Sequence, residues 1–273
     1  MLVVEVHGAR IPAIGLGTMT LKEATCVNAV ATALRVGYRH LDTAERYGNE
    51  QWVGEGLRAS GVKREDVFLT TKVYQDKLAP ADFERSVDES LKKLQVPWVD
   101  LLLIHWPNPA VPLADTLRVL CKAKRNGLTK HVGVANFTTA LIDEAVKLSS
   151  EPLVTNQIEV HPFLNQSKVI AKCRQHGMSV TAYCPVARGK VPGSEVLERI
   201  GKVHGKSSAQ VSLRYLVQQG IIPIPRSSNP EHLKANLDVF DWSLSGAEMA
   251  EIGKLTRPDG RVVNPPHAPK WDT

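Results

Sequence analysis

Residues 99–137 read VDLLLIHWPNPAVPLADTLRVLCKAKRNGLTKHVGVANF. A short apolar run ends near His105, an amphipathic stretch follows over residues 113–126, and a second apolar run occupies residues 130–137. Short apolar runs without polar alternation are typical of strands buried on both faces of a parallel sheet. This stretch therefore predicts two parallel strands that are joined by a helix.

Similar units repeat along the whole chain. Strands are predicted at residues 11–19, 38–42, 67–73, 99–106, 130–137, 152–160, 178–186 and 221–227. Helices are predicted at residues 24–36, 50–59, 81–94, 113–126, 138–148, 166–176 and 207–218. Eight strands in 273 residues make units of about 34 residues, which is typical of a single (β/α)8 TIM barrel.

Other segments lie outside this repeat. Residues 2–14 predict an N-terminal β-hairpin, and residues 231–239 and 245–255 predict extra C-terminal helices. The Pro-rich tail from Pro258 predicts an extended segment over one mouth of the barrel. We expect residues 1–273 to form one domain of this kind.

The alternative architecture is a doubly wound sheet with a second domain, which would carry a glycine-rich dinucleotide fingerprint. The Gly15-Leu16-Gly17 motif lacks the third glycine, because Thr20 occupies that position. Residues 54–59 fit the spacing, but they lie inside a predicted helix with no strand leading into them. Both matches are weak, so the barrel is favoured.

The composition is that of an ordinary globular protein, with 43% hydrophobic and 23% charged residues. No apolar run approaches the ~18 residues of a membrane helix, and the N-terminus does not resemble a signal peptide. The four cysteines lack C-x-x-C spacing, so we expect reduced thiols and a cytoplasmic protein. The net charge is +6, but the short basic clusters lie on predicted helices, and we expect neither nucleic acid nor a membrane as a partner.

Polar or ionisable side chains end nearly every predicted strand. In a (β/α)8 barrel, these carboxyl ends meet at one face, which carries the active site. The side chains are Thr18, Asp42, Lys72, His105, Asn136, Gln157 with Glu159, Tyr183, and Arg226 with Ser227. Each alone has an ordinary structural explanation, but their recurrence at the same position of successive units predicts a convergent site.

Tyr47 follows the second strand and is a candidate proton donor, although the pKa of a tyrosine is near 10. An ammonium ~4 Å away stabilises a phenolate by ~4 kcal/mol at an effective dielectric of ~20. Lys72 could supply it if Asp42 kept the buried lysine charged. We therefore expect Lys72 to lower the pKa of Tyr47 and a neutral His105 to orient a carbonyl oxygen. Such a set suits carbonyl reduction, with the hydride supplied by a cofactor.

Other chemistries fit these residues less well. His105, His131 and His161 lack the H-x-H or H-E-x-x-H spacing of a metal hydrolase, so we expect no metal. A Schiff base on Lys72 requires a neutral amine, whereas Asp42 would favour the ammonium. A serine hydrolase would carry G-x-S-x-G, which the sequence lacks.

The motifs around these residues resemble the aldo-keto reductase family over essentially the whole chain. They are residues 37–44 (GYRHLDTA) with Tyr47, residues 69–73 (LTTKV) and residues 99–107 (VDLLLIHWP). The resemblance implies that Asp42, Tyr47, Lys72 and His105 are catalytic, with Tyr47 as general acid, and that NADPH binds without a Rossmann domain. The compact loops are similar to those of the bacterial branch of 2,5-diketo-D-gluconate reductases. This implies a monomer that reduces small aldehydes, dicarbonyls or keto-sugars.

The resemblance also implies the cofactor contacts. Asn136 and Gln157 would hold the nicotinamide carboxamide, and Tyr183 would stack on the ring. The full expected set is Thr18, Asn136, Gln157, Tyr183, Arg226, Ser227, His232 and Asn236. Met19, Tyr74 and Trp106 would form the walls of the substrate pocket.

The chain departs from the family pattern near the cofactor. Ala135 and Cys184 replace common serines, and Ala235 replaces an acid. His232 stands where the family typically has an arginine for the 2′-phosphate of NADPH, and an imidazole binds phosphate less well than a guanidinium. We expect a shallow NADPH preference, carried by Arg226, Ser227 and backbone amides, with NADH usable. A cofactor-binding sensor without turnover is the alternative, but the intact catalytic set favours an enzyme.

Overall fold

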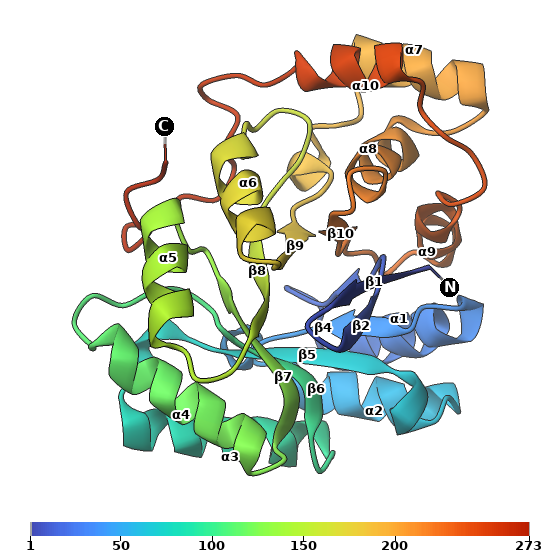
Figure 1. The fold of residues 1–273 in the computed structure, drawn as a ribbon. Helices are drawn as coiled ribbons and strands as arrows, with labels where there is room; N and C mark the ends of the chain where they lie inside the picture. The colour runs from blue at the N-terminus through green and yellow to red at the C-terminus, as the bar shows by residue number, and fades with distance from the viewer. Residues whose placement is uncertain (1, 273) are drawn as a thin grey trace.

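The computed structural model describes residues 2–272. Eight parallel strands follow one another around a curled sheet in chain order, with helices on the outside (Figure 1). The strands are β3 (Leu16–Gly17), β4 (His40–Asp42), β5 (Phe68–Val73), β6 (Val99–Ile104), β7 (Thr129–Ala135), β8 (Leu153–Glu159), β9 (Ser179–Tyr183) and β10 (Ile222–Pro223). This confirms the predicted (β/α)8 fold.

The sheet closes between β3 and the segment that contains β10. Gly15 N donates to Pro223 O at 3.0 Å, and Gly17 N donates to Pro225 O at 3.1 Å. Proline has no N–H to donate in return, so this junction carries only half of a normal parallel ladder. For this reason the predicted strand at residues 221–227 is regular only over Ile222–Pro223.

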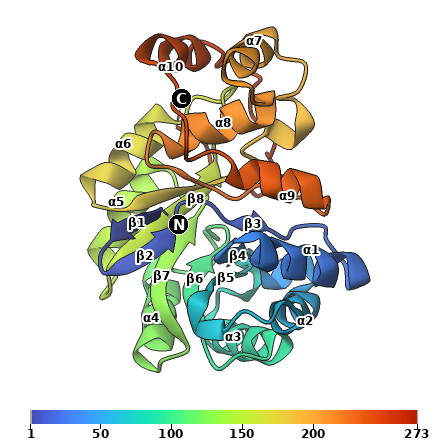
Figure 2. The same ribbon diagram turned by 90° about the vertical axis from the view of Figure 1, so that its right-hand side faces the viewer.

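Ten α-helices lie within residues 2–272. They are α1 (Glu23–Val36), α2 (Glu50–Ser60), α3 (Pro80–Leu94), α4 (Leu113–Arg125), α5 (Thr139–Leu148), α6 (Ser167–Gln175), α7 (Glu195–His204), α8 (Ser208–Val217), α9 (Pro230–Leu237) and α10 (Gly246–Gly253). The sequence prediction missed α7, which lies against α10 (Figure 1). Helix α9 packs on both α1 and α8, so the helical layer also closes where the sheet closes (Figure 2).

The predicted N-terminal hairpin is confirmed as β1 (Val3–Val6) and β2 (Ala9–Pro12). Buried Ile11 of β2 packs with Leu101 and Ile222 inside the barrel, so the hairpin closes its N-terminal end. The predicted first strand at residues 11–19 was wrong in extent. Its beginning belongs to the hairpin, and only Leu16–Gly17 is a barrel strand.

The main core lies between the sheet and the helices. Leu41, Leu69 and Leu102 point outward from successive strands and pack against residues such as Val30 and Leu120 of the helices. The predicted closing helices are slightly shorter than expected, and the chain after α10 continues past α6 and ends beside α5 (Figure 1). Within residues 2–272, no helix is long and apolar enough to cross a membrane.

Candidate active site

A buried lysine lies at the centre of the C-terminal mouth of the barrel. Lys72 of β5 points inward, and its Nζ donates to Asp42 Oδ1 of β4 at 2.5 Å and to Thr43 O at 2.8 Å. The Tyr47 hydroxyl, at the end of the short helix η1 (Glu45–Tyr47), lies 3.5 Å from the same Nζ. Burial lowers the pKa of Lys72, but Asp42 and Tyr47 outweigh that effect and raise it overall, so the ammonium stays charged.

Asp42 has partners on both sides. Its second carboxylate oxygen accepts a hydrogen bond from Gln157 Nε2 of β8 at 2.7 Å, so the amide and the lysine fix the carboxylate across the barrel. Thr18 donates to Asp42 O from its hydroxyl and its backbone nitrogen, both at 3.0 Å. In this structure Thr18 therefore holds the β3 loop against β4.

His105 directly follows β6, and its ring lies edge-on to the Tyr47 ring, with centroids 5.7 Å apart. Burial, and after it the nearby Lys72, His267 and Arg46, hold the pKa of His105 well below its usual range. The imidazole is therefore neutral near pH 7. Its Nδ1 is buried without a hydrogen-bond partner, and because a buried unpaired N–H is rare, we infer that the hydrogen is on Nε2.

The pKa of Tyr47 differs from the sequence-based expectation. Burial raises it, and the nearby Lys72 ammonium counters only part of that rise, so the net direction is upward. The extent of burial could not be read from the sequence, and desolvation disfavours the charged phenolate. The phenol therefore keeps its proton at neutral pH, and Lys72 acts by stabilising the phenolate once it forms.

The structure brings three predicted cofactor residues together beside this centre. Asn136 Nδ2 donates to His105 O at 2.9 Å, and Tyr183 Oη donates to Asn136 Oδ1 at 2.8 Å. Asn136 has a φ of 63°, a left-handed conformation that asparagine tolerates better than most residues. Asn136 and Gln157 each make only some of the hydrogen bonds that an amide can form, so both retain capacity for a ligand.

The other predicted cofactor residues lie around the start of α9. Ser227 and Asn236 are buried, whereas Arg226 and His232 are exposed. Asn229 Oδ1 already accepts hydrogen bonds from the backbone nitrogens of Glu231 and His232. These two backbone amides at the start of α9 are thus occupied in this conformation.

Aromatic side chains surround the open side of His105. Tyr74 lies edge-on to the His105 ring at 5.5 Å, and buried Trp106 lies edge-on to His267 at 5.2 Å. Met19, the third predicted wall residue, follows Thr18 and is 47% exposed. His267 was missed because only the three-dimensional fold brings the C-terminal segment to this mouth.

Glu159, a strand-end residue to which the sequence assigned no role, holds that segment in place. Its carboxylate accepts hydrogen bonds from Val262 N at 2.6 Å and Val263 N at 2.8 Å, and His161 Nε2 lies 2.9 Å from the same group. Farther along, Asp272 accepts hydrogen bonds from the backbone and hydroxyl of Thr139. The expected tail over one mouth is confirmed, and it covers the mouth that contains Lys72.

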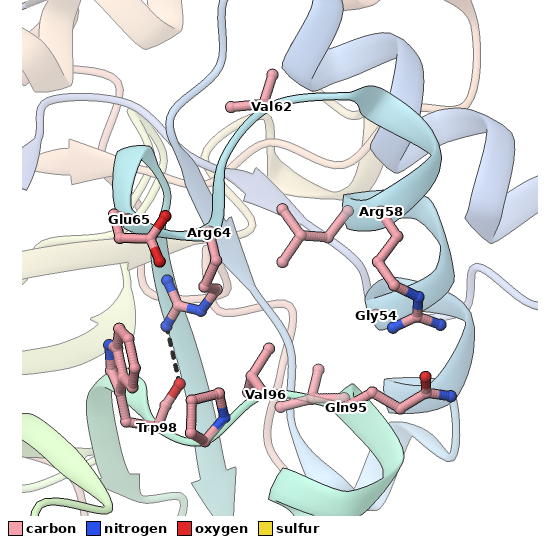
Figure 3. Close-up of a pocket in the computed structure, with 11 residues that line it drawn as sticks. Gly54, Arg58, Val62, Arg64, Glu65, Gln95, Val96 and Trp98 are labelled. Carbon is pink, nitrogen blue, oxygen red and sulfur yellow. Dashed lines mark hydrogen bonds between the residues drawn. The ribbon is translucent and has the colours of Figure 1, made fainter.

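A separate hollow of about 240 Å³ lies near the other end of the barrel (Figure 3). It is bounded by α2, the end of α3, and the segments that precede β5 and β6, including Arg64 and Trp98. Arg64 is held there by Asp100 at 2.7 Å and by Trp98 O at 2.9 Å. None of the predicted catalytic or cofactor residues lines this hollow, so we place the candidate active site at the opposite mouth.

Comparisons with known proteins agree with this architecture. The model of the Aldo/keto reductase family matches residues 13–257. Methylglyoxal reductase DkgB of Escherichia coli O157:H7 is 40% identical over 266 residues, which cover 96% of this chain and 99% of that protein. The crystal structure of a proposed 2,5-diketo-D-gluconic acid reductase B is 46% identical, with a TM-score of 0.98, covering 100% of this chain and 98% of that chain.

A Bombyx mori aldo-keto reductase in complex with NADP is 35% identical, with a TM-score of 0.88, covering 96% of this chain and 94% of that chain. The fold and the matches define an oxidoreductase that acts on carbonyl compounds. The chain belongs to the aldo/keto reductase family, whose members use NAD(P)H. The resemblance inferred from the sequence motifs is confirmed.

Proposed function

We propose that the chain reduces the carbonyl group of small aldehydes, dicarbonyls or keto-sugars with NADPH, and that Tyr47 is the general acid. The observation that carries the proposal is the position of Lys72 Nζ, 2.5 Å from Asp42 Oδ1 and 3.5 Å from Tyr47 Oη. A buried carboxylate thus keeps a lysine charged beside a group that can give up a proton.

Tyr47 Oη holds the proton that the product alcohol needs. The phenol is protonated at neutral pH because burial raises its pKa. A substrate oxygen that gains negative charge is more basic than a phenolate, so the proton moves to it from Tyr47. Lys72 then stabilises the phenolate, and Asp42 and Thr43 O hold the lysine in position for this role.

His105 supplies a second contact to the same oxygen. Its neutral ring donates from Nε2 without adding a titratable charge to the pocket. The edge-on rings of Tyr47 and Tyr74 flank it, at 5.7 and 5.5 Å respectively. The carbonyl oxygen would therefore be oriented by two donors, of which only the Tyr47 hydroxyl loses its proton.

The residues beside this centre fit a nicotinamide cofactor. Asn136 and Gln157 have spare amide donors and acceptors for a carboxamide, and Tyr183 offers an aromatic ring next to them. Arg226, Ser227, His232 and Asn236 would contact the adenosine phosphate end, and Thr18 would support the adjacent loop. The cofactor supplies the hydride, which no side chain can provide.

We further propose that the chain is one domain over residues 1–273 and acts as a cytoplasmic monomer without nucleic-acid or membrane partners. Cys26, Cys121 and Cys173 are buried and free, which is consistent with a reducing compartment. The bonded tail and the closed N-terminal hairpin support a single folding unit.

The test is to measure NADPH and NADH oxidation with glyoxals, aromatic aldehydes and keto acids. We expect turnover of several small carbonyl compounds, with NADPH preferred by a small factor. Tight nucleotide binding without oxidation by any of these compounds would contradict the proposal and indicate a sensor. A stronger response to NADH would contradict the cofactor assignment alone.

A further inference from the structure

A cationic side chain, Arg46, and an imidazole, His267, lie at the outer edge of the aromatic wall beside His105. The Arg46 guanidinium lies 5.2 Å from the centroid of the Tyr74 ring. His267 contacts the same tyrosine, with its Nε2 3.3 Å from Tyr74 Oη. Since the Tyr74 ring is itself 5.5 Å from the His105 ring, Arg46 and His267 are both one side chain away from the expected position of the carbonyl.

The charge of Arg46 has no partner among the residues that the structure describes. The Arg46 side chain is exposed. Within residues 2–272 it lies against the Tyr74 ring but forms no ion pair and no side-chain hydrogen bond. The preceding residue, Glu45, turns its carboxylate away, where it accepts hydrogen bonds from Lys77 Nζ and Ser86 Oγ, both at 2.8 Å. The guanidinium donors of Arg46 are therefore free at the edge of the mouth.

The other carboxylates described at this mouth are already bonded. Asp42 binds Lys72, Glu159 binds the backbone nitrogens of the tail, and Asp272 binds Thr139. Arg46 and His267 act electrostatically on each other: burial, and then Arg46, lower the pKa of His267. A negative group placed between them would pair with the Arg46 charge and accept a hydrogen bond from the His267 ring.

We propose that Arg46 and His267 bind a carboxylate on the substrate, so that the favoured substrates are carbonyl compounds that also carry a carboxylate. This inference rests on the proposed reductase function and narrows its substrate class to aldehyde acids and keto acids. A guanidinium recognises a carboxylate through two parallel hydrogen bonds, and His267 adds a third donor. Both are specificity-determining residues, and neither contributes to the proton transfer.

The experiment compares 4-carboxybenzaldehyde with its neutral methyl ester, methyl 4-formylbenzoate. The readout is the ratio of kcat/KM for the acid to kcat/KM for the ester, measured for each variant. The two aldehydes differ in intrinsic reactivity, but this difference is the same for every variant, so it cancels when the ratio is compared between variants. We expect Arg46→Met to lower the ratio about tenfold, mainly through KM for the acid, because a charged hydrogen-bonded contact is lost.

Three further variants separate recognition from general charge effects. Arg46→Lys should retain part of the preference for the acid over the ester. His267→Gln should lower the ratio by a smaller factor than Arg46→Met. Arg125→Met removes the same charge at the C-terminal end of α4, where the Arg125 guanidinium donates to Ser150 Oγ, and should leave the ratio unchanged. Added salt should raise KM for the acid and leave KM for the ester constant.

An unchanged ratio in Arg46→Met, or equal losses for acid and ester, would overturn the proposal. The same holds if Arg125→Met lowers the ratio as much as Arg46→Met. If the wild type reduces the ester but none of these variants changes the ratio, the carboxylate-binding inference is wrong and the proposed reductase function remains. Failure of the wild type to reduce either aldehyde would instead reject the proposed function, and the inference with it.

Discussion

Two buried aspartates, one near each end of the barrel, are held in similar ways. At the C-terminal mouth, Asp42 accepts hydrogen bonds from Lys72 at 2.5 Å and Gln157 at 2.7 Å. Near the N-terminal end, Asp100 of β6 is bonded by Arg64 at 2.7 Å and Lys130 at 2.9 Å. A buried carboxylate paired with a cation is therefore present at both ends of the barrel and does not by itself identify the active site.

The difference lies in what the cation contacts next. Lys72 lies 3.5 Å from the Tyr47 hydroxyl, which can lose a proton. Arg64 donates to Val67 O and Trp98 O, neither of which can. A buried ion pair thus supports acid–base chemistry only where a titratable third group faces a pocket, and elsewhere it joins segments of the fold.

The largest expected effect is on Tyr47. Tyr47→Phe should lower kcat by ~10²-fold or more with a reactive neutral aldehyde, because the proton donor is removed. Thermal stability should change little, since the hydroxyl makes only the 3.5 Å contact with Lys72. Near-normal turnover by the folded variant would contradict the claim that the Asp42–Lys72 pair, unlike the Asp100–Arg64 pair, supports a proton donor.

Asp100→Asn tests the other end. Loss of its ion pairs with Arg64 and Lys130 should lower the free energy of unfolding by about 2 kcal/mol, as measured by urea denaturation. Lys130 is half exposed, which limits the contribution of that pair. We expect kcat of the folded variant to stay within about twofold of wild type, because only transition-state contacts affect it. A loss of kcat like that of Tyr47→Phe would show that the two aspartates do not have separate roles.

The smallest effect concerns a side chain that lies at neither aspartate. His232→Arg should lower KM for NADPH about threefold to tenfold, because a guanidinium binds phosphate better than an imidazole. KM for NADH, which lacks that phosphate, should remain the same. Equal changes for the two nucleotides would place residue 232 away from the phosphate.

The repeating apolar runs were sufficient to predict the barrel, because burial on both faces leaves a strong pattern in each strand. They were less informative at the closing strands. The run at residues 11–19 is shared between β2 and β3, and prolines 223 and 225 shorten β10 by removing N–H donors. Helix α7 was missed although its buried residues Leu197 and Ile200 recur at helical spacing.

Within the candidate site, position was easier to predict than environment. Asp42, Lys72 and His105 each end or follow a strand, and the regular geometry of the barrel brings such residues together. Lys72 lowers the pKa of Tyr47 as expected, but burial of the phenol, which the sequence does not show, raises that pKa by more. The sequence predicted a tail over a mouth of the barrel but not which mouth. That choice and the position of His267 depend on contacts between residues more than 100 positions apart, such as Glu159 with Val262, which no local pattern reports.

The most direct test of the account is the pH profile of kcat/KM for a neutral aldehyde in the wild type and in Lys72→Met. The phenol must be protonated to donate, so activity should be present below the pKa of Tyr47 and should fall as the pH rises through it. Removing the ammonium raises that pKa, so the falling limb should move to higher pH, with a lower plateau. The double variant Asp42→Asn/Lys72→Met, which leaves no buried unpaired charge, should shift the limb in the same direction but by less, because the Asp42 carboxylate itself raises the pKa of Tyr47. An unchanged limb in both folded variants would contradict the coupling of Tyr47 to Lys72.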